Sequence, residues 1–403
     1  MGNTPNIRFK GFTDDWEQRK LGEVFQEYSE KNHPELPALT IIQGGGTVLR
    51  EKSERKLQYD KSSLAWYKMV REDDFIVHLR SFEGGLEKSN HNGLISPAYH
   101  TFHGDEVDSR FYYPYFRSYE FIKHKLVPHV YGIRDGRSID IDGMKTIEIP
   151  WTSYEEQKKI GDYIESLDTL ITLHQRKCDE TKKLKKFMLQ KMFPKKDEKK
   201  PEIRFAGFTD DWEQRKLIDY LEVSSEKNRD NRFTKDDVLS VSGEYGIVNQ
   251  IEFQGRSFAG ASVSNYGVVE NGDVVYTKSP LKSNPYGIIK TNKGIPGIVS
   301  TLYAVYKPKE ITDSKFVQIY FELDSRMNSY MHPLVNKGAK NDMKVSAENA
   351  LKGMVSFPKK DEQEMISLYF SYLDNLIALH QRKCDEIKKI KKFMLQNMFP
   401  QKG

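Results

Sequence analysis

Hydrophobic positions recur at alternating intervals of four and three residues along two long stretches of the chain. The first stripe runs from Ile160 through Leu167 to Met192, and the second from Ile366 through Leu373. Lys, Arg, Asp and Glu flank both stripes, and this pattern predicts two long amphipathic helices with the seam of a coiled coil. Neither stretch contains an internal proline, and each ends in Met-Phe-Pro, where proline stops a helix. We therefore expect helices over 152–193 and 359–400.

The two predicted helices are copies of one another. Residues 167–194 and 373–400 agree at 23 of 28 positions, and a shorter segment at 5–21 returns at 201–217 with 15 of 17 positions identical. Agreement at this level shows that the chain is an internal duplication. Each half has the same order of short repeat, variable region and long helix.

An apolar stripe of this length has to be buried against another surface, and the other copy is the obvious partner. A two-fold relation between the halves would make the helices antiparallel. The alternative is that each helix packs on its own globular region. If the helices pair, we expect the seam to include Leu167, Ile171, His174, Cys178, Leu373, Ile377, His380 and Cys384.

The regions between these repeats are rich in Gly, Tyr and Phe and contain short β-type runs bounded by turn residues. Faint echoes between them, such as Asp74-Phe75-Ile76-Val77 and Asp273-Val274-Val275-Tyr276, indicate one shared fold. The prediction is an α+β protein with two similar mixed α/β domains, joined by two antiparallel coiled-coil helices with pseudo-two-fold symmetry. The expected segments are a first domain (1–151), a helix (152–193), a linker (194–201), a second domain (202–358) and a second helix (359–400).

Composition narrows the class of protein. Hydrophobic residues make up 37% of the chain and charged residues 30%, and no apolar run is long enough for a membrane span. Only two cysteines occur, both on the predicted seams, which favours a reducing cytoplasm over a disulfide framework. The net charge of +5 is compatible with a nucleic-acid partner but is weak support for one.

We find no pattern that predicts catalysis or a metal site. Gly44-Gly45-Gly46 lacks the Lys-Ser/Thr of a phosphate loop, and a turn is the better interpretation. Asn284-Pro285-Tyr286 is the nearest approach to a methyltransferase motif, but it lacks the second proline. The histidines are scattered without cysteines or carboxylates at metal-ligand spacing.

Basic and amide side chains cluster in loops that follow predicted strands. Such side chains can hold phosphates or read base edges, although a solvated loop is the simpler reading of any single residue. In the first variable region the candidates for DNA binding are His78, Arg80, Ser81, Lys88, Asn90, Arg134 and Arg137. In the second they are Lys278, Ser279, Lys282, Asn284, Lys337, Lys340, Asn341 and Lys344.

Several motifs together carry a family resemblance. They are the duplicated helix ending in KKLKKFMLQKMFP, the FTDDWEQRKL segments at 12–21 and 208–217, and the EQKKI run at 156–160. With two variable regions in this layout, the chain resembles the specificity subunit of type I restriction-modification enzymes over essentially its whole length. The second helix departs slightly, with EQEMI at 362–366.

The resemblance implies that each variable region is a target recognition domain that reads one half of a split double-stranded DNA site. It implies that the helices set the gap and dock two modification subunits, which methylate adenine with S-adenosylmethionine. Restriction subunits then add ATP- and Mg-dependent translocation and cleavage, so no cofactor is expected in this chain. A stand-alone DNA methyltransferase and a protein-interaction scaffold without a DNA role are the alternatives.

Overall fold

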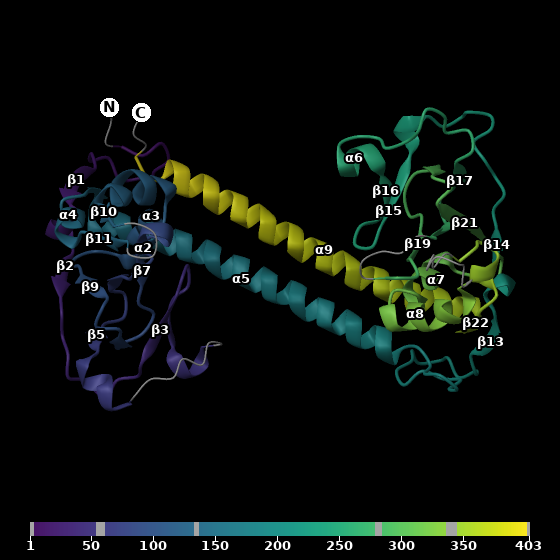
Figure 1. Cartoon of the computed structure of the whole chain (residues 1–403), viewed down its shortest axis with the longest axis horizontal. Coiled ribbons are helices and arrows are strands. Elements are labelled where there is room, and N and C mark those ends of the chain that lie inside the picture. The colour runs from purple at the N-terminus through teal and green to yellow at the C-terminus, as the bar shows by residue number, and fades with distance from the viewer. Residues whose placement is uncertain (1–3, 54–60, 133–136, 279–283, 336–344, 401–403) are drawn as a thin grey trace. The chain divides into compact units, whose positions relative to one another are not determined.

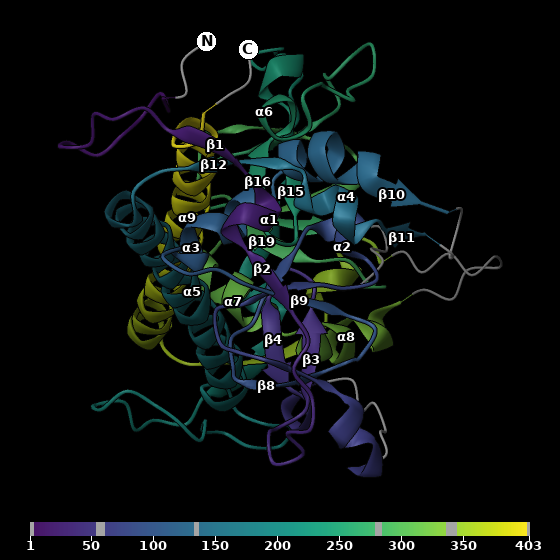
Figure 2. The same cartoon turned by 90° about the vertical axis from the view of Figure 1, so that its left-hand side faces the viewer.

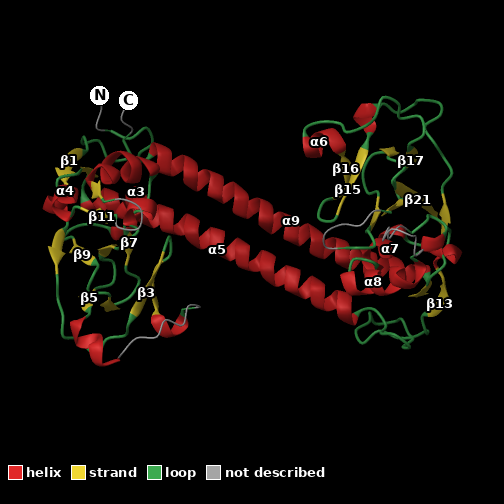
Figure 3. Cartoon of the chain, in the orientation of Figure 1, coloured by secondary structure: helices red, strands yellow, loops and turns green. Residues whose placement is uncertain are grey.

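The computed structural model describes residues 4–53, 61–132, 137–278, 284–335 and 345–400. They divide into two compact units. The first unit comprises 1–175 and 382–403, and the second comprises 176–381. Helices and short strands are mixed in both (Figures 1 and 3), which confirms the predicted α+β class. The expected domain boundaries themselves stay a prediction.

The two long helices are α5 (Tyr154–Lys191) and α9 (Lys360–Asn397), each of 38 residues. Both end a few residues before the predicted limits at 193 and 400. The reason is that Met192 and Phe193 leave the helix for the core of the second unit, while Met398 and Phe399 enter the core of the first. The Met-Phe-Pro ending therefore contributes two side chains to a hydrophobic core and also ends the helix.

Within each unit α5 and α9 run antiparallel, as predicted. In the first unit Lys391 Nζ lies 2.5 Å from Asp168 Oδ1, and the Cys384 thiol donates to the carbonyl oxygen of Ile171 at 3.9 Å. Residue numbers thus rise along α5 as they fall along α9, and the two ribbons lie side by side in both views (Figures 1 and 2). The second unit repeats these contacts with Lys185 to Asp374 (2.6 Å) and Cys178 to Ile377 (3.9 Å).

The first unit is built on a four-stranded antiparallel sheet in the order β2-β9-β6-β7. Its strands are β2 (Gln26–Tyr28), β9 (His100–His103), β6 (Phe75–Val77) and β7 (Glu87–Lys88). Two-stranded ladders surround it: β1 (Glu17–Lys20) with β12 (Glu148–Trp151), β3 (Leu39–Ile42) with β4 (Gly46–Leu49), β5 (Lys68–Val70) with β8 (Gly93–Ile95), and β10 (Val130–Tyr131) with β11 (Ser138–Ile139). Its shorter helices are α1 (Leu21–Val24), α2 (Ser81–Gly84), α3 (Ser109–Phe116) and α4 (Ile141–Lys145).

The second unit repeats this plan. Its sheet has the order β14-β21-β18-β19, with β14 (Leu221–Val223), β21 (Tyr303–Pro308), β18 (Val274–Thr277) and β19 (Ile289–Thr291). The ladders are β13 (Glu213–Lys216) with β22 (Met354–Phe357), β15 (Leu239–Ser242) with β16 (Gly246–Asn249), and β17 (Gly267–Val269) with β20 (Gly297–Val299). Its helices are α6 (Gln250–Gln254), α7 (Ser314–Tyr320) and α8 (Asp324–Met331).

Strand order, pairing direction and register correspond between the units. Phe75 pairs with Phe102 on β9, and the matching residue Val274 pairs with Tyr306 on β21. Both units also contain one isolated parallel bridge at the same place, Ala38 to Leu94 and Val238 to Ile298. The variable regions therefore share one fold, as the faint sequence echoes predicted.

The repeated tryptophan anchors the short repeat in each core. Trp16 packs edge-on against Phe111 and Phe399, and Trp212 packs in the same way against Phe193 and Phe316. The short repeats are thus docking segments for the domains that follow them. This packing is one reason why the repeats stay nearly identical while the rest of each domain differs.

The Glu-Gln pair near the start of each long helix ties that helix to its domain. Buried Glu156 accepts two hydrogen bonds from the Arg8 guanidinium, at 2.6 and 2.8 Å, and one from Trp16 Nε1 at 3.0 Å. Gln157 Oε1 accepts from the backbone N–H of Asp108 at 3.0 Å. The second unit repeats both bonds with Arg204 to Glu362 and Asp313 to Gln363.

Candidate nucleic-acid interface

In the first unit the candidate interface begins where β6 ends. The backbone N–H of His78 donates to Ser81 Oγ at 2.9 Å, which fixes the turn into α2. Burial lowers the pKa of the His78 imidazole, and Ser81 is fully buried, so both side chains belong to the turn itself. Arg80 is exposed between them. Of these three predicted residues, Arg80 is the one best placed to meet a ligand.

Gly85 ends the turn, at a position that leaves no space for a side chain. Its φ is +85°, and a Cβ there would lie 2.2 Å from the carbonyl oxygen of Phe116. The turn is therefore held against the end of α3 at a distance that only glycine permits. This close approach fixes the position of α2 in the unit.

Two segments distant in sequence join α2. The Arg137 guanidinium lies 4.4 Å above the Phe82 ring and 3.4 Å from the Glu83 carboxylate. On another side, a Cβ at Gly84 would lie 2.1 Å from Gln43 Nε2, so the tip of the β3–β4 hairpin contacts α2. The structure thus gathers Arg80, Arg137 and Gln43 around one short helix.

A buried carboxylate fixes the hairpin tip. Glu87 on β7 accepts hydrogen bonds from the backbone N–H of Gly44 at 2.8 Å and of Gly46 at 3.1 Å. It also accepts from the Tyr113 hydroxyl at 2.7 Å and pairs with Arg117. The glycine triplet is a turn, as predicted, and these bonds attach it to the central sheet.

Two of the predicted residues are engaged in holding the fold. Lys88 Nζ lies 2.6 Å from Asp73 Oδ1, and Asn90 Nδ2 donates to the carbonyl oxygens of Gly45 and Thr47. Their contribution to an interface is therefore the placement of the hairpin. Arg134, also predicted, lies outside the described residues.

In the second unit Lys278 follows β18, as expected. Its Nζ donates to the carbonyl oxygen of Thr301 at 2.8 Å, and burial lowers the pKa of its ammonium group. Asn284 is buried, and its amide donates to Asp324 on α8 at 2.9 Å. The other predicted residues of this unit lie outside the described ranges: Ser279, Lys282, Lys337, Lys340, Asn341 and Lys344.

The predicted seam residues of the long helices all face at least partly away from solvent. Four are buried, namely Leu167, Cys178, Leu373 and Cys384. Four are half-buried, namely Ile171, His174, Ile377 and His380. A heptad pattern depends only on local helix geometry, which is why sequence periodicity can propose such positions. Their role in helix pairing stays a prediction.

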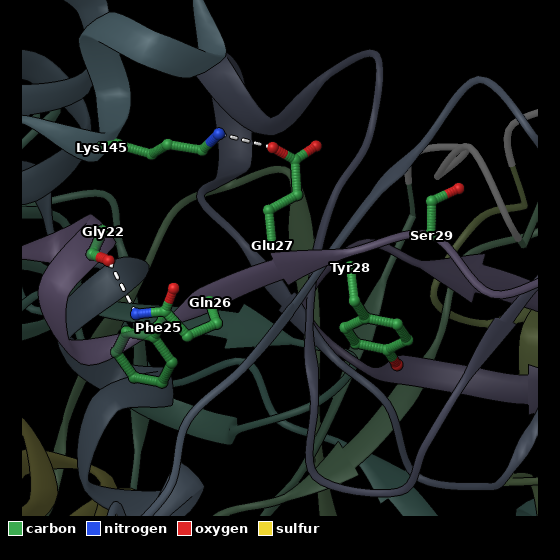
Figure 4. A pocket seen from close by; sticks show the side chains of 7 residues that line it. All are labelled: Gly22, Phe25, Gln26, Glu27, Tyr28, Ser29 and Lys145. Carbon is green, nitrogen blue, oxygen red and sulfur yellow. Dashed lines mark hydrogen bonds and ion pairs between the residues drawn. The ribbon is translucent and has the colours of Figure 1, made fainter.

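A cavity of about 330 Å³ lies at the edge of the first unit, lined by Gly22, Phe25, Gln26, Glu27, Tyr28, Ser29 and Lys145 (Figure 4). Its polar groups are bonded to neighbouring protein groups. Glu27 pairs with Lys145 at 2.6 Å and with His100 at 2.7 Å, and Gln26 Nε2 donates to the Gly22 carbonyl oxygen at 3.0 Å. These contacts connect β2 to α4, β9 and α1, which favours a structural role.

The described part of the chain offers neither a metal site nor a membrane-spanning helix. No group of three or more His, Cys, Asp or Glu side chains is placed there to hold a metal ion. No helix in the same ranges is long and apolar enough to cross a membrane.

Comparison with known proteins supports the resemblance seen in the motifs. No family model matches the chain. The MjaX specificity subunit of a type I restriction enzyme from Methanocaldococcus jannaschii is 26% identical over 280 residues, which are 63% of this chain and 59% of that protein. The MjaVIII specificity subunit from the same organism is 24% identical over 268 residues, 63% of this chain and 61% of that protein. The match thus spans about three fifths of the length of these curated relatives.

A solved structure extends the likeness to the whole fold. The S subunit of a type I restriction-modification system from M. genitalium has a TM-score of 0.58 at 14% sequence identity. The alignment covers 99% of this chain and 100% of that one. The predicted resemblance to type I specificity subunits is therefore confirmed, and the chain has the fold of an S subunit.

Proposed function

We propose that this chain is the non-catalytic DNA-reading subunit of a type I restriction-modification complex. The observation that carries the proposal is the internal duplication. Two units share strand order and register, the parts that join them are nearly identical in sequence, and the outer parts have diverged. Two heads of one fold with different surfaces suit a target with two different half-sites.

The first head reads its half-site with the surface around α2. Arg80 and Arg137 supply the positive charge, and Gln43 on the adjoining hairpin tip supplies an amide that can pair with adenine. Glu83 beside Arg137 orients the guanidinium and limits its reach. Gln43 was not predicted from the sequence, because only the fold brings it to α2.

Modification subunits dock on the paired long helices. In the second unit α5 carries exposed Leu184 and Phe187, and in the first unit the matching positions of α9 are exposed Ile390 and Phe393. Large apolar side chains at equivalent exposed places suit a partner that binds twice. The partners supply S-adenosylmethionine, ATP and Mg, and the complex acts on DNA in the cytoplasm.

The length of the helical pair sets the gap between the half-sites. DNA advances by about 34–36 Å per turn, and a 38-residue helix at about 1.5 Å per residue is longer than that. From this length we expect a DNA target in which the base pairs between the two half-sites are not recognised.

Methylated adenines mapped in a host genome, with and without this chain, test the proposal. With its modification subunit present, the chain should direct methylation to one two-part sequence. Exchange of residues 22–150 for another recognition domain should change one half of that sequence and leave the other half and the gap unchanged. Methyl transfer by the purified chain alone, or a methylation pattern indifferent to the chain, would refute the proposal.

A further inference from the structure

The tip of the β15–β16 hairpin in the second unit corresponds to the tip that contacts α2 in the first. Register makes the correspondence definite, because Leu39 pairs with Leu49 in one hairpin and Leu239 pairs with Asn249 in the other. Tyr245 therefore occupies the place of Gly45. At this position the first tip has no side chain, whereas the second carries an aromatic ring.

Tyr245 belongs to an exposed aromatic pair. Its side chain is 62% exposed and that of Phe253 on α6 is 44% exposed, and the two ring centroids are 5.4 Å apart. Helix α6 is fixed in place, since the Asn249 side chain caps its start and Gly255, with φ +75°, ends it. Figure 1 shows α6 directly beside β16. The pair is thus presented on an ordered element.

A positively charged arginine side chain follows this helix in the sequence. The Arg256 guanidinium is 4.5 Å from the Phe258 ring centroid, and the Phe258 N–H donates to the side chain of Gln250 at 2.7 Å, which ties this segment back to α6. Exposed aromatic rings beside an arginine suit a ligand with stacked bases and phosphates better than a purely apolar partner.

The second hairpin has a different residue at the position of the Glu87 anchor. Lys290 on β19 pairs with Val275 as Glu87 pairs with Ile76, so the two residues are equivalent. An ammonium group has no acceptor for the backbone N–H groups that Glu87 binds. Lys290 therefore cannot hold the second hairpin tip to the sheet with the hydrogen bonds that Glu87 accepts in the first unit.

We propose that Tyr245 and Phe253 form a wedge that enters the base stack of the second half-site. This inference rests on the proposed function and adds to it an asymmetry. The second head unstacks a base step, whereas the first head has glycine at the equivalent tip position and reads its half-site with the side chains around α2. Apolar or aromatic wedges of this kind partly unstack DNA, and the added contacts offset the cost of unstacking.

The test uses the complex with its modification subunit and a duplex whose half-sites have been defined by methylation mapping. 2-Aminopurine, whose fluorescence rises on unstacking, replaces single bases through the second half-site. The target adenine is left out of the wedge assay, because methyltransferases flip that base themselves. It serves instead as a positive control for an assembled complex.

We expect fluorescence to rise at one step of the second half-site and at none in the first. The Tyr245→Ala/Phe253→Ala double variant should lose this signal and bind the specific duplex about 5- to 150-fold more weakly, at about 1–3 kcal/mol per stacked base. Tyr245→Trp should keep the signal. Tyr119→Ala, which removes an exposed tyrosine from the first unit, is the matched control and should leave the signal unchanged.

Specific binding and a flipped target base without any unstacked step nearby would overturn the wedge and leave the proposed function intact. The same holds if the signal survives in the double variant. If the double variant instead loses a protein subunit from the complex, the aromatic pair is a protein contact. Absence of sequence-specific binding by the unaltered complex would refute the proposed function itself.

Discussion

The two equivalent tryptophans offer a matched test of the interior. Trp16 and Trp212 are both buried and have equivalent aromatic neighbours. They differ at the indole nitrogen. Trp16 Nε1 donates to the Glu156 carboxylate at 3.0 Å, whereas Trp212 Nε1 has no hydrogen-bond partner among the described residues. Replacement by phenylalanine removes similar volume from both sites but removes a hydrogen bond from only one.

The expected difference follows from the two nitrogen environments. Trp16→Phe loses a hydrogen bond to a charged group, which is worth about 1.5–3 kcal/mol. Trp212→Phe instead removes a buried N–H group that has no hydrogen-bond partner among the described residues, and burying such a group costs the folded state about 1–3 kcal/mol. The shared loss of packing cancels in the comparison. Trp16→Phe should therefore destabilise its unit by about 2.5–6 kcal/mol more than Trp212→Phe destabilises the other.

Hydrogen exchange followed by mass spectrometry on the full chain gives a local reading in each unit. The amides of β1 and β13 are the reporters, because these strands directly follow the two tryptophans. Protection in β1 should fall more in Trp16→Phe than protection in β13 falls in Trp212→Phe. Equal losses, or a larger loss in β13, would refute the reasoning.

Three further predictions follow from single sites. Burial lowers the pKa of Lys290, so between that pKa and the ordinary lysine value near 10.4 the unfolded chain binds more protons and stability rises with pH. The Lys290→Met variant should therefore be more stable than the unaltered protein at pH 7, and this advantage should shrink as the pH approaches 10. Thermal unfolding at several pH values measures the difference. Arg137→Ala should weaken specific binding about tenfold, near 1.4 kcal/mol, and relax selection in the first half-site only, by titration against half-site mutants with Lys31→Ala as control. One heptad inserted into both α5 and α9 adds about 10 Å and should widen the gap by about three base pairs in methylation maps, because seam register is kept; an unchanged gap would contradict the spacer role.

The sequence was most informative where local geometry decides the structure. The presence of two long helices and the duplication follow from periodicity and identity alone, and the structure contains both helices. The candidate interface was harder to predict because its members meet only in the folded chain. Gln43 and Arg137 reach α2 from separate hairpins, and the structural duties of Lys88 and Asn90 depend on partners that no spacing reveals.

The divergence between the units extends into their interiors. Glu87 and Arg117 pair in the first unit, and at the equivalent positions of the second unit stand Lys290 and Glu322, with the charges exchanged. Two like charges buried at these positions would repel one another, whereas a coordinated exchange keeps one charge of each sign. Recombination inside a domain would therefore join carboxylate with carboxylate, or cation with cation, at a site that positions the hairpin. Recombination at the repeats keeps each pair whole, because the short repeat and the long helix enclose both members. The near-identity of the repeats thus gives the chain crossing points at which one variable domain can be replaced without disturbing the charges inside the other.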